Sequence, residues 1–184
     1  LLSDDPLIED EDVTALLTIS GGDARGSLAV ALSDGSHRLR AVAKDRAGNE
    51  SVITAGFVVD TLAPTLVIDT PQTGTFSKTA EPVITLLFDD ERSGLQEDAI
   101  SVKVDGIERS THLTRTATGA TLALAASQGL GLADGMHRIE ARVIDRAGNA
   151  TDATAVDFGV DTVAPTAAVL APLPNAFVGL ATPP

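Results

Sequence analysis

The residues of this chain that could take part in catalysis are three histidines and the serine and carboxylates near them. Ser36 and His37 are neighbours at the start of an expected strand, so their side chains point to opposite faces and cannot form a nucleophile–base pair. In a later copy of the same stretch Met136 replaces the serine. His112 lies among polar residues without the spacing of metal ligands. With no cysteine and no tyrosine in the chain, we predict that it is not an enzyme.

Carboxylates offer a second kind of chemistry. Asp89 and Asp90 are adjacent, but the two acids of a glycosidase lie across the substrate from each other, which neighbours in sequence rarely do. The glycines around Gly129 and Gly131 lack the lysine of a phosphate-binding loop. Cation binding remains, because the chain has 26 acidic residues against 13 basic ones and Ca²⁺ prefers oxygen ligands. The surplus of negative charge could equally serve only to keep a secreted protein soluble.

The same charge balance excludes some partners. Nucleic acids and anionic membrane surfaces require clustered lysine and arginine, and this chain has a pI near 4.4. No apolar run approaches the roughly 20 residues needed to cross a bilayer, so we predict no membrane insertion. The chain has no signal-peptide pattern and no initiator methionine. We therefore expect it to be a piece of a longer protein.

Two long stretches of the chain are nearly the same. Residues 32–49 read LSDGSHRLRAVAKDRAGN, and residues 132–149 read LADGMHRIEARVIDRAGN. The two stretches begin 100 residues apart. An interval of this length suits one compact domain better than a solenoid unit. A second shared phrase, FVVDTLAPT from Phe57 and FGVDTVAPT from Phe158, closes each copy. The sequence therefore predicts two domain equivalents, joined at a proline that ends the preceding strand.

Hydrophobic residues alternate with polar ones in many short segments. Ile139, Ala141 and Val143 would face a core while Arg138 and Arg142 face solvent. Such segments, separated by Asp-Gly and other turn signals, are typical of an all-β antiparallel sandwich. The strands expected in the second domain are 65–69, 82–90, 99–106, 120–126, 136–145 and 155–161.

The combination of a DG-x-His turn, a D-x-AGN turn and a VDT-x-AP-T linker resembles the bacterial Ig-like repeats of large secreted and surface adhesins. The resemblance covers about a third of the chain, appears twice in register, and implies tandem Ig-like antiparallel β-sandwiches. Such repeats usually have tyrosine where this chain has His37 and His137. We expect each histidine ring to hydrogen bond to nearby backbone, as a tyrosine does at the corner of many sandwiches.

The resemblance also implies module boundaries. Residues 1–62 are expected to form an Ig-like module that lacks strand A and most of strand B. Residues 63–163 would form a complete module, and residues 164–184 the first strand or strands of a third.

Two explanations remain open for why the expected first module is incomplete and a further segment follows the second one. The chain is either an arbitrary window on a longer array, or a unit of a filament in which each tail completes the first sandwich of an adjacent chain by strand donation. The expected partners are therefore neighbouring Ig-like modules of the same or an adjacent chain, with a homopolymer as one alternative.

The strand order implied by the resemblance brings several oxygen-bearing side chains to one end of the second module. They come from the preceding linker, the loop that starts with FDDERSG at Phe88, and the D-x-AGN turn. Their convergence would be costly without a cation. We expect calcium as the cofactor at this junction. The predicted ligands are Asp60, Asp89, Asp90, Asp145 and Asn149.

A purely structural role is the alternative. Asp45 and Asp145 would then only hydrogen bond to the backbone of their AGN turns, as aspartates in Asx-turns do. Asp60 and Asp161 would only fix the linkers, through the adjoining threonines Thr61 and Thr162.

The function that this pattern favours is mechanical. We predict structural spacer repeats of an extracellular bacterial adhesin or surface filament, stiffened by calcium at module junctions. A module that binds a polysaccharide or a receptor is an alternative, although the chain has no Trp or Tyr for stacking on sugars. An accessory module of a secreted hydrolase is another alternative.

Overall fold

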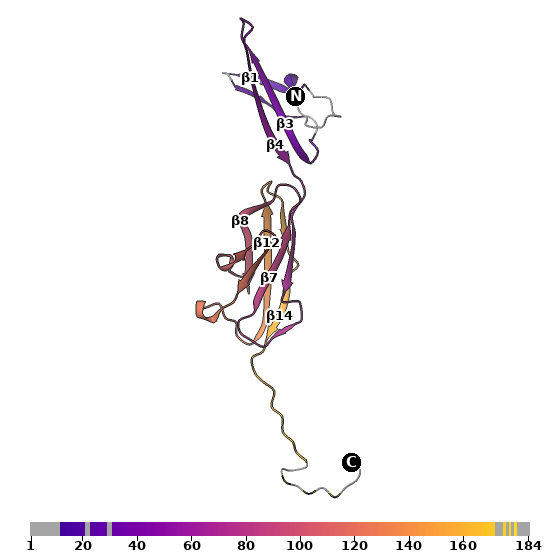
Figure 1. Cartoon of the computed structure of the whole chain (residues 1–184), viewed down its shortest axis with the longest axis vertical. Coiled ribbons are helices and arrows are strands. Elements are labelled where there is room, and N and C mark those ends of the chain that lie inside the picture. Colours follow the sequence, from indigo (N-terminus) through magenta and orange to yellow (C-terminus); the bar gives the residue numbers. More distant parts are fainter. Residues whose placement is uncertain are drawn as a thin grey trace.

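The computed structural model describes residues 12–20, 23–28, 31–171, 175, 177 and 179. The N-terminal end of the described chain forms two hairpins. Figure 1 shows them beyond one end of a unit of packed strands, with an extended segment leaving the opposite end. The predicted all-β class is confirmed: besides strands, the described residues form only three short 3₁₀ turns. No helix among them is long and apolar enough to span a lipid bilayer.

The central unit contains two sheets. The smaller sheet has the order β10-β11-β7-β5, and all of its pairings are antiparallel. Its strands are β5 (Thr65–Thr70), β7 (Val83–Asp89), β10 (Thr114–Arg115) and β11 (Gly119–Ala123).

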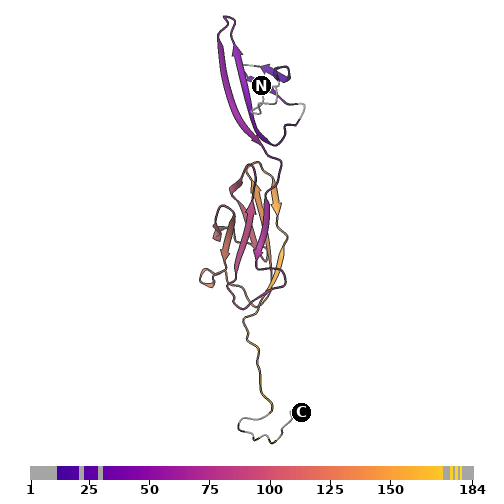
Figure 2. The ribbon, with the colours of Figure 1, turned by 45° about the vertical axis from the view of Figure 1, so that its right-hand side comes forward.

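The larger sheet has the order β6-β14-β12-β8-β9, with β13 paired to β12. Only the short β6–β14 pair is parallel within this sheet. The two sheets lie face to face (Figure 2). The strands of the larger sheet are β6 (Phe76–Ser77), β8 (Leu95–Val104), β9 (Ile107–Glu108), β12 (Gly135–Asp145), β13 (Ala150–Asp152) and β14 (Val156–Val160).

The core lies between these two sheets and follows the predicted alternation. In β12, Ile139, Ala141 and Val143 are buried while the arginines between them are not. Each fully buried side chain of this size contributes about 1.5–3 kcal/mol through the hydrophobic effect. The buried apolar residues are Leu66, Ile68, Ile84, Leu86, Phe88, Ile100, Val102, Val104, Ala120, Leu122, Leu124, Leu130, Ile139, Ala141, Val143, Val156, Phe158 and Val160.

All six strands predicted for this unit are present, with one informative difference in length. β8 begins at Leu95, four residues earlier than expected, because a register shift between Val143 and Asp145 lets Leu95 pair with Asp145. Bulges of this kind redirect a side chain at the end of a sheet. Here the bulge lies beside the end of β12, where Asp145 is located.

Residues 12–62 are organised differently from the central unit. The described part contains two separate hairpins, β1 (Leu17–Ser20) with β2 (Asp23–Gly26) and β3 (Gly35–Lys44) with β4 (Glu50–Val59). No apolar side chain described in this part is buried. Residues 1–11, at the start of the expected first module, lie outside the described residues. The division into a truncated first module and a complete second one therefore stays a prediction.

The C-terminal segment forms no strand between Asp161 and Leu170. It extends away from the pole opposite the N-terminal hairpins (Figure 1). Val169 and Leu170 are 75% and 86% exposed. The prediction that residues 164–184 begin a third module remains, and most of those after Ala171 lie outside the described part of the chain.

Candidate metal centre at the junction

The linker between β4 and β5 is held from its N-terminal side by the Asp34-Gly35 turn. Asp34 accepts hydrogen bonds from the Thr61 N–H at 3.0 Å and from the Thr61 hydroxyl at 3.2 Å. Asp60 then accepts a bond from the Leu62 N–H at 3.1 Å. These contacts fix the direction in which the chain leaves β4.

The second linker repeats this arrangement. Asp134 binds the Thr162 N–H and hydroxyl at 3.0 and 3.2 Å, and Asp161 accepts from the Val163 N–H at 3.0 Å. Asp60 and Asp161 thus bond within their linkers, as the structural alternative has it, but to Leu62 and Val163 rather than through the adjoining threonines. The threonines are held by the aspartates of the two Asp-Gly turns, because the start of one strand and the end of its hairpin partner lie side by side.

The central unit holds the first linker from the other side. The Asn149 Nδ2 group lies 3.0 Å from the carbonyl oxygen of Asp60, 3.1 Å from that of Leu62 and 2.8 Å from Asp145 Oδ2. All three partners are acceptors, which assigns the donor side of the amide to the linker. The hydroxyl of Thr151 also donates to the carbonyl oxygen of Pro64. Asn149 therefore joins the linker to the turn after β12.

Asp145 is fully buried and closes that turn. Its Oδ1 accepts from the N–H groups of Gly148 at 2.7 Å and Asn149 at 2.8 Å. Gly148 has φ = 97°, which glycine adopts without strain. The exposed Asp45 makes the same bonds with the Asn49 N–H and side chain, at 2.8 and 2.7 Å, so this Asx-type role is present in both copies.

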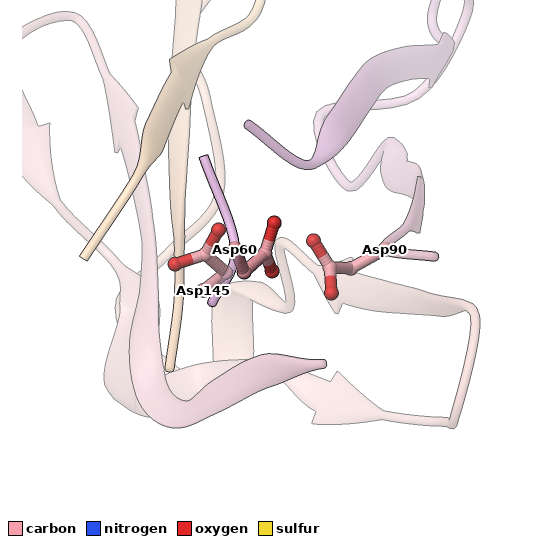
Figure 3. A group of neighbouring side chains, drawn as sticks. All are labelled: Asp60, Asp90 and Asp145. Atoms are coloured by element: carbon pink, nitrogen blue, oxygen red, sulfur yellow. The ribbon is translucent and has the colours of Figure 1, made fainter. Parts of the chain in front are cut away.

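Three of the predicted ligands meet at the junction. Asp60, Asp90 and Asp145 each present a carboxylate oxygen, and these oxygens all lie within 4.8 Å of one another. Figure 3 shows the three carboxylates side by side, with Asp60 between the other two. They come from the linker, the loop after β7 and the end of β12. Residues far apart in sequence thus converge on one point.

The other two predicted ligands are placed differently. Asp89 is exposed at the end of β7, where its Oδ1 accepts from the Asp90 N–H at 3.0 Å. It does not belong to the group of three. Asn149 borders the group but turns its amide nitrogen toward Asp145.

Backbone donors compensate much of the charge in the group. Asp60 Oδ2 accepts from the Ser93 N–H at 3.0 Å. Asp90 Oδ1 accepts from the Arg92 N–H at 3.2 Å and also from the Gly94 N–H. Charged oxygens that accept such bonds are less costly to bring together.

The pKa of the Asp60 carboxyl is held below its ordinary value. The neighbouring Ser93 hydroxyl is the largest cause, followed by the N–H groups of Leu62 and Ser93 and the charge of Arg92, and together they outweigh burial. The Ser93 hydroxyl is buried and meets no hydrogen-bond geometry among the described residues. The hydrogen bond from Ser93 to Asp60 is donated by its N–H. Asp60 is thus favoured as a carboxylate, the form that a metal ion binds.

The dimensions of the group fit one Ca²⁺ ion. Calcium–oxygen distances are about 2.3–2.6 Å, so two oxygens on opposite sides of the ion are separated by about 5 Å. A span of 4.8 Å between oxygens satisfies this limit. The three carboxylates would supply three of the six to eight oxygen ligands that Ca²⁺ takes.

The two histidines of the repeat have the structural role expected of them. His37 Nε2 lies 2.7 Å from the carbonyl oxygen of Ser33, and His137 Nε2 lies 2.8 Å from that of Ala133. This prediction is confirmed. His137 has an additional partner, because its Nδ1 lies 2.7 Å from Asp105 Oδ2.

Some residues of the junction are absent from the predicted site. Asp34 and Asp134 carry a signal in the sequence, since each precedes a repeated glycine and lies a nearly constant distance from a repeated Asp-Thr pair. Ser93 and Thr151 carry none that we can identify, because they act through a backbone N–H and through a contact with a distant carbonyl.

Residues 78–162 match the model of a family of bacterial Ig-like domains. This segment contains most of the central two-sheet unit, whose sequence is therefore similar to bacterial Ig-like domains. No curated protein sequence matches the chain.

Several solved structures align with part of this chain. The endo-β-1,4-mannanase of Thermotoga petrophila aligns at 15% identity over 56% of this chain and 21% of its own, with a TM-score of 0.45. CopC of Methylosinus trichosporium OB3b aligns at 20% identity over 53% of this chain and 93% of its own, with a TM-score of 0.40. The fibronectin(III)-like modules of Clostridium thermocellum CbhA align at 12% identity over 54% and 99%, also with a TM-score of 0.40.

Proposed function

We propose that this chain is a structural spacer from an extracellular bacterial adhesin or surface filament. The observation that carries the proposal is the linker between β4 and β5, which is hydrogen bonded by the units on both of its sides. A linker bound on one side only would allow the units to rotate independently. Bonds from both sides restrict the angle between them.

The path of the chain through the central unit supports the same function. The linker enters at one pole, and the segment after β14 leaves at the other (Figure 1). Modules connected in this way add their lengths along one axis. A spacer needs this property more than it needs a catalytic cleft.

We also propose calcium as the ion that stiffens this junction. Asp60 belongs to the linker, whereas Asp90 and Asp145 belong to the central unit, so an ion held by all three would bind the two parts together. The carboxylates would supply the negative charge and part of the oxygen shell that Ca²⁺ requires.

The test of the spacer function compares Asn149→Ala with the matched variant Asn49→Ala. Both remove the same side chain from an AGN turn, but only Asn149 contacts the linker. We expect the hairpins of residues 12–62 and the central unit to tumble together in the unchanged protein and in Asn49→Ala. In Asn149→Ala they should tumble with separate correlation times.

Backbone ¹⁵N relaxation measures these correlation times directly, and small-angle X-ray scattering reports the corresponding spread of lengths. Independent tumbling in the unchanged protein would contradict the proposed function. So would an Asn149→Ala variant as stiff as the unchanged protein, since the bonds to the linker would then have no mechanical effect.

A further inference from the structure

We propose that the side-chain hydroxyl of Ser93 is a further oxygen ligand of the ion at the junction. It would bind beside the carboxylates of Asp60, Asp90 and Asp145. This inference rests on the proposed calcium site and adds to it a residue that is neither acidic nor marked by any pattern in the sequence.

The Ser93 hydroxyl is a buried polar group without a partner. Its oxygen is shielded from solvent and forms no hydrogen bond within the part of the chain that the structure describes. An unpaired buried hydroxyl destabilises a folded protein. A group of this kind therefore needs an explanation, and a bound ion or water is a common one.

The backbone on both sides of this hydroxyl is held in place. The Ser93 N–H donates to Asp60 Oδ2 at 3.0 Å, and the Ser93 carbonyl oxygen accepts from Arg146 Nη1 at 3.4 Å. The next residue, Gly94, donates its N–H to Asp90 Oδ1, and its carbonyl oxygen accepts from the Arg146 N–H at 2.9 Å. A ligand fixed in this way loses little conformational freedom when an ion binds.

The hydroxyl also lies close to the three carboxylates, which are shown side by side in Figure 3. It is the largest influence that lowers the pKa of Asp60, and a neutral dipole has such an effect only at short range. Asp60 in turn has an oxygen within 4.8 Å of oxygens of Asp90 and Asp145. Ligand oxygens of one Ca²⁺ ion lie within about 5 Å of one another. A hydroxyl that adjoins Asp60 can therefore bind the same ion.

A serine oxygen suits this position chemically. It has two lone pairs that can face a cation. Ca²⁺ takes six to eight oxygen ligands, so three carboxylates leave further ligand positions for neutral oxygens. A neutral ligand also adds no repulsion to a group that already contains three negative charges.

Two arginines of the neighbouring turns are directed to other partners. Arg92 Nε lies 3.8 Å from Asp34 Oδ2, and Arg146 Nη1 bonds to the Ser93 carbonyl. Among the residues that the structure describes, no lysine or arginine forms an ion pair with the three carboxylates. A cation from solution would neutralise these carboxylates and give the Ser93 oxygen a partner at the same time.

A hollow of about 240 Å³ gives an ion a route to the group. Its walls include Asp60 and Asp90, together with Leu62, Thr65 and Glu91. The acidic side chains on these walls favour the approach of a cation. An entry path of this kind is one of the features that a metal site requires.

The variant Ser93→Ala tests the proposal in the whole chain. It keeps the backbone N–H that bonds to Asp60 and removes the hydroxyl alone. Isothermal titration calorimetry with calcium chloride measures the dissociation constant, which we expect to rise about tenfold or more, as is usual when a group that supports a metal site is lost. Urea unfolding in chelator measures the stability without calcium. There Ser93→Ala should be at least as stable as the unchanged protein, because it no longer buries an unpaired hydroxyl.

Ser110→Ala is the matched control, because the Ser110 hydroxyl has a partner. It accepts a hydrogen bond from the Val102 N–H at 2.7 Å. Removing it should lower the stability in chelator and leave the calcium dissociation constant unchanged. The two serines should thus have opposite effects in the two measurements.

Equal calcium affinity in the unchanged protein and in Ser93→Ala would overturn the proposal. So would a Ser93→Ala variant that is less stable than the unchanged protein in chelator, since the hydroxyl would then have a structural role without an ion. An unchanged protein that binds no calcium would overturn the ion itself. The spacer function is tested separately, by the tumbling of Asn149→Ala and Asn49→Ala, so its failure is distinguishable from the failure of this inference.

Discussion

At the scale of single residues, the same side chain has different consequences in the two copies of the repeat. His37 and His137 both bond to a carbonyl four residues earlier, but only His137 is known to contact a carboxylate, that of Asp105. Burial alone would lower the pKa of His137. The bonds to Asp105 and Ala133 and the charge of Asp105 outweigh burial, so the pKa of His137 is raised.

The pKa of Asp105 changes in the opposite direction. Burial, the largest single influence, would raise it, but the bonds from His137 and from the Arg138 N–H, with the charges of His137 and Arg109, lower it. Asp105 is therefore favoured as a carboxylate when His137 is protonated. The two residues form an ion pair with N and O 2.7 Å apart.

This ion pair predicts a pH dependence of the stability of the central unit. The contribution of His137 is complete below its ordinary pKa of 6.5 and is lost as the pH rises through the raised value. The contribution of Asp105 is present above its ordinary pKa of 3.8 and is lost as the pH falls through the lowered value. The pair should add at most about 1 kcal/mol, because Asp105 is 42% exposed and partly screened.

Urea unfolding of the unchanged protein and of His137→Gln at several pH values measures this contribution. The difference between the two should be larger at pH 5.5 than at pH 8.5. His37→Gln is the matched control and should show no such change for the central transition. A difference between the unchanged protein and His137→Gln that is constant across this range would exclude a charged pair.

At the scale of the elements, the sheets of the central unit depend on the close approach of strands. Gly119 in β11 is buried against β7, and a Cβ atom added there would lie 2.7 Å from the backbone oxygen of Leu86. Backbone in the middle of a sheet cannot move away without breaking its ladder. The position therefore requires glycine for space rather than for an unusual φ angle.

We predict that Gly119→Ala destabilises the central unit by about 1–3 kcal/mol, the usual cost of overpacking. The measurement is the midpoint of urea or thermal unfolding. Gly56→Ala is the matched control in β4, where the nearest atom to an added Cβ lies 3.9 Å away. Gly56→Ala should leave the unfolding transition of the central unit unchanged. A Gly119→Ala variant as stable as the unchanged protein would show that β7 and β11 leave room for a Cβ atom at this position.

At the scale of the whole molecule, the three carboxylates determine whether an ion stiffens the protein. We predict that Ca²⁺ raises the melting temperature of the unchanged protein and narrows its distribution of lengths in scattering. At a concentration a hundred times the dissociation constant, binding to the folded state alone adds about 2.7 kcal/mol of stability. Mg²⁺ should do less, because it keeps its own waters.

The variants Asp90→Asn and Asp89→Asn separate a bound ion from general screening. Both remove one negative charge from neighbouring positions, but only Asp90 belongs to the group of three. The increase in melting temperature and the narrower distribution of lengths that Ca²⁺ causes should be lost in Asp90→Asn and kept in Asp89→Asn. A protein whose melting temperature and scattering are the same with Ca²⁺ and with chelator binds no stiffening ion at this junction.

The sequence alone determined the strands of the central unit and the inward face of each, because a period of two places every second residue on the same side of a sheet. The strand order implied by the resemblance to bacterial Ig-like repeats also indicated which loops approach Asp60. The tertiary structure determined the contacts between distant residues, which the local sequence pattern does not contain. It placed Asp90 rather than Asp89 in the group, directed the amide of Asn149 to the linker, and assigned Thr61 to Asp34. Each of these depends on how distant segments pack, and a side chain at the end of a strand can turn to either side of a loop until its neighbours are in place.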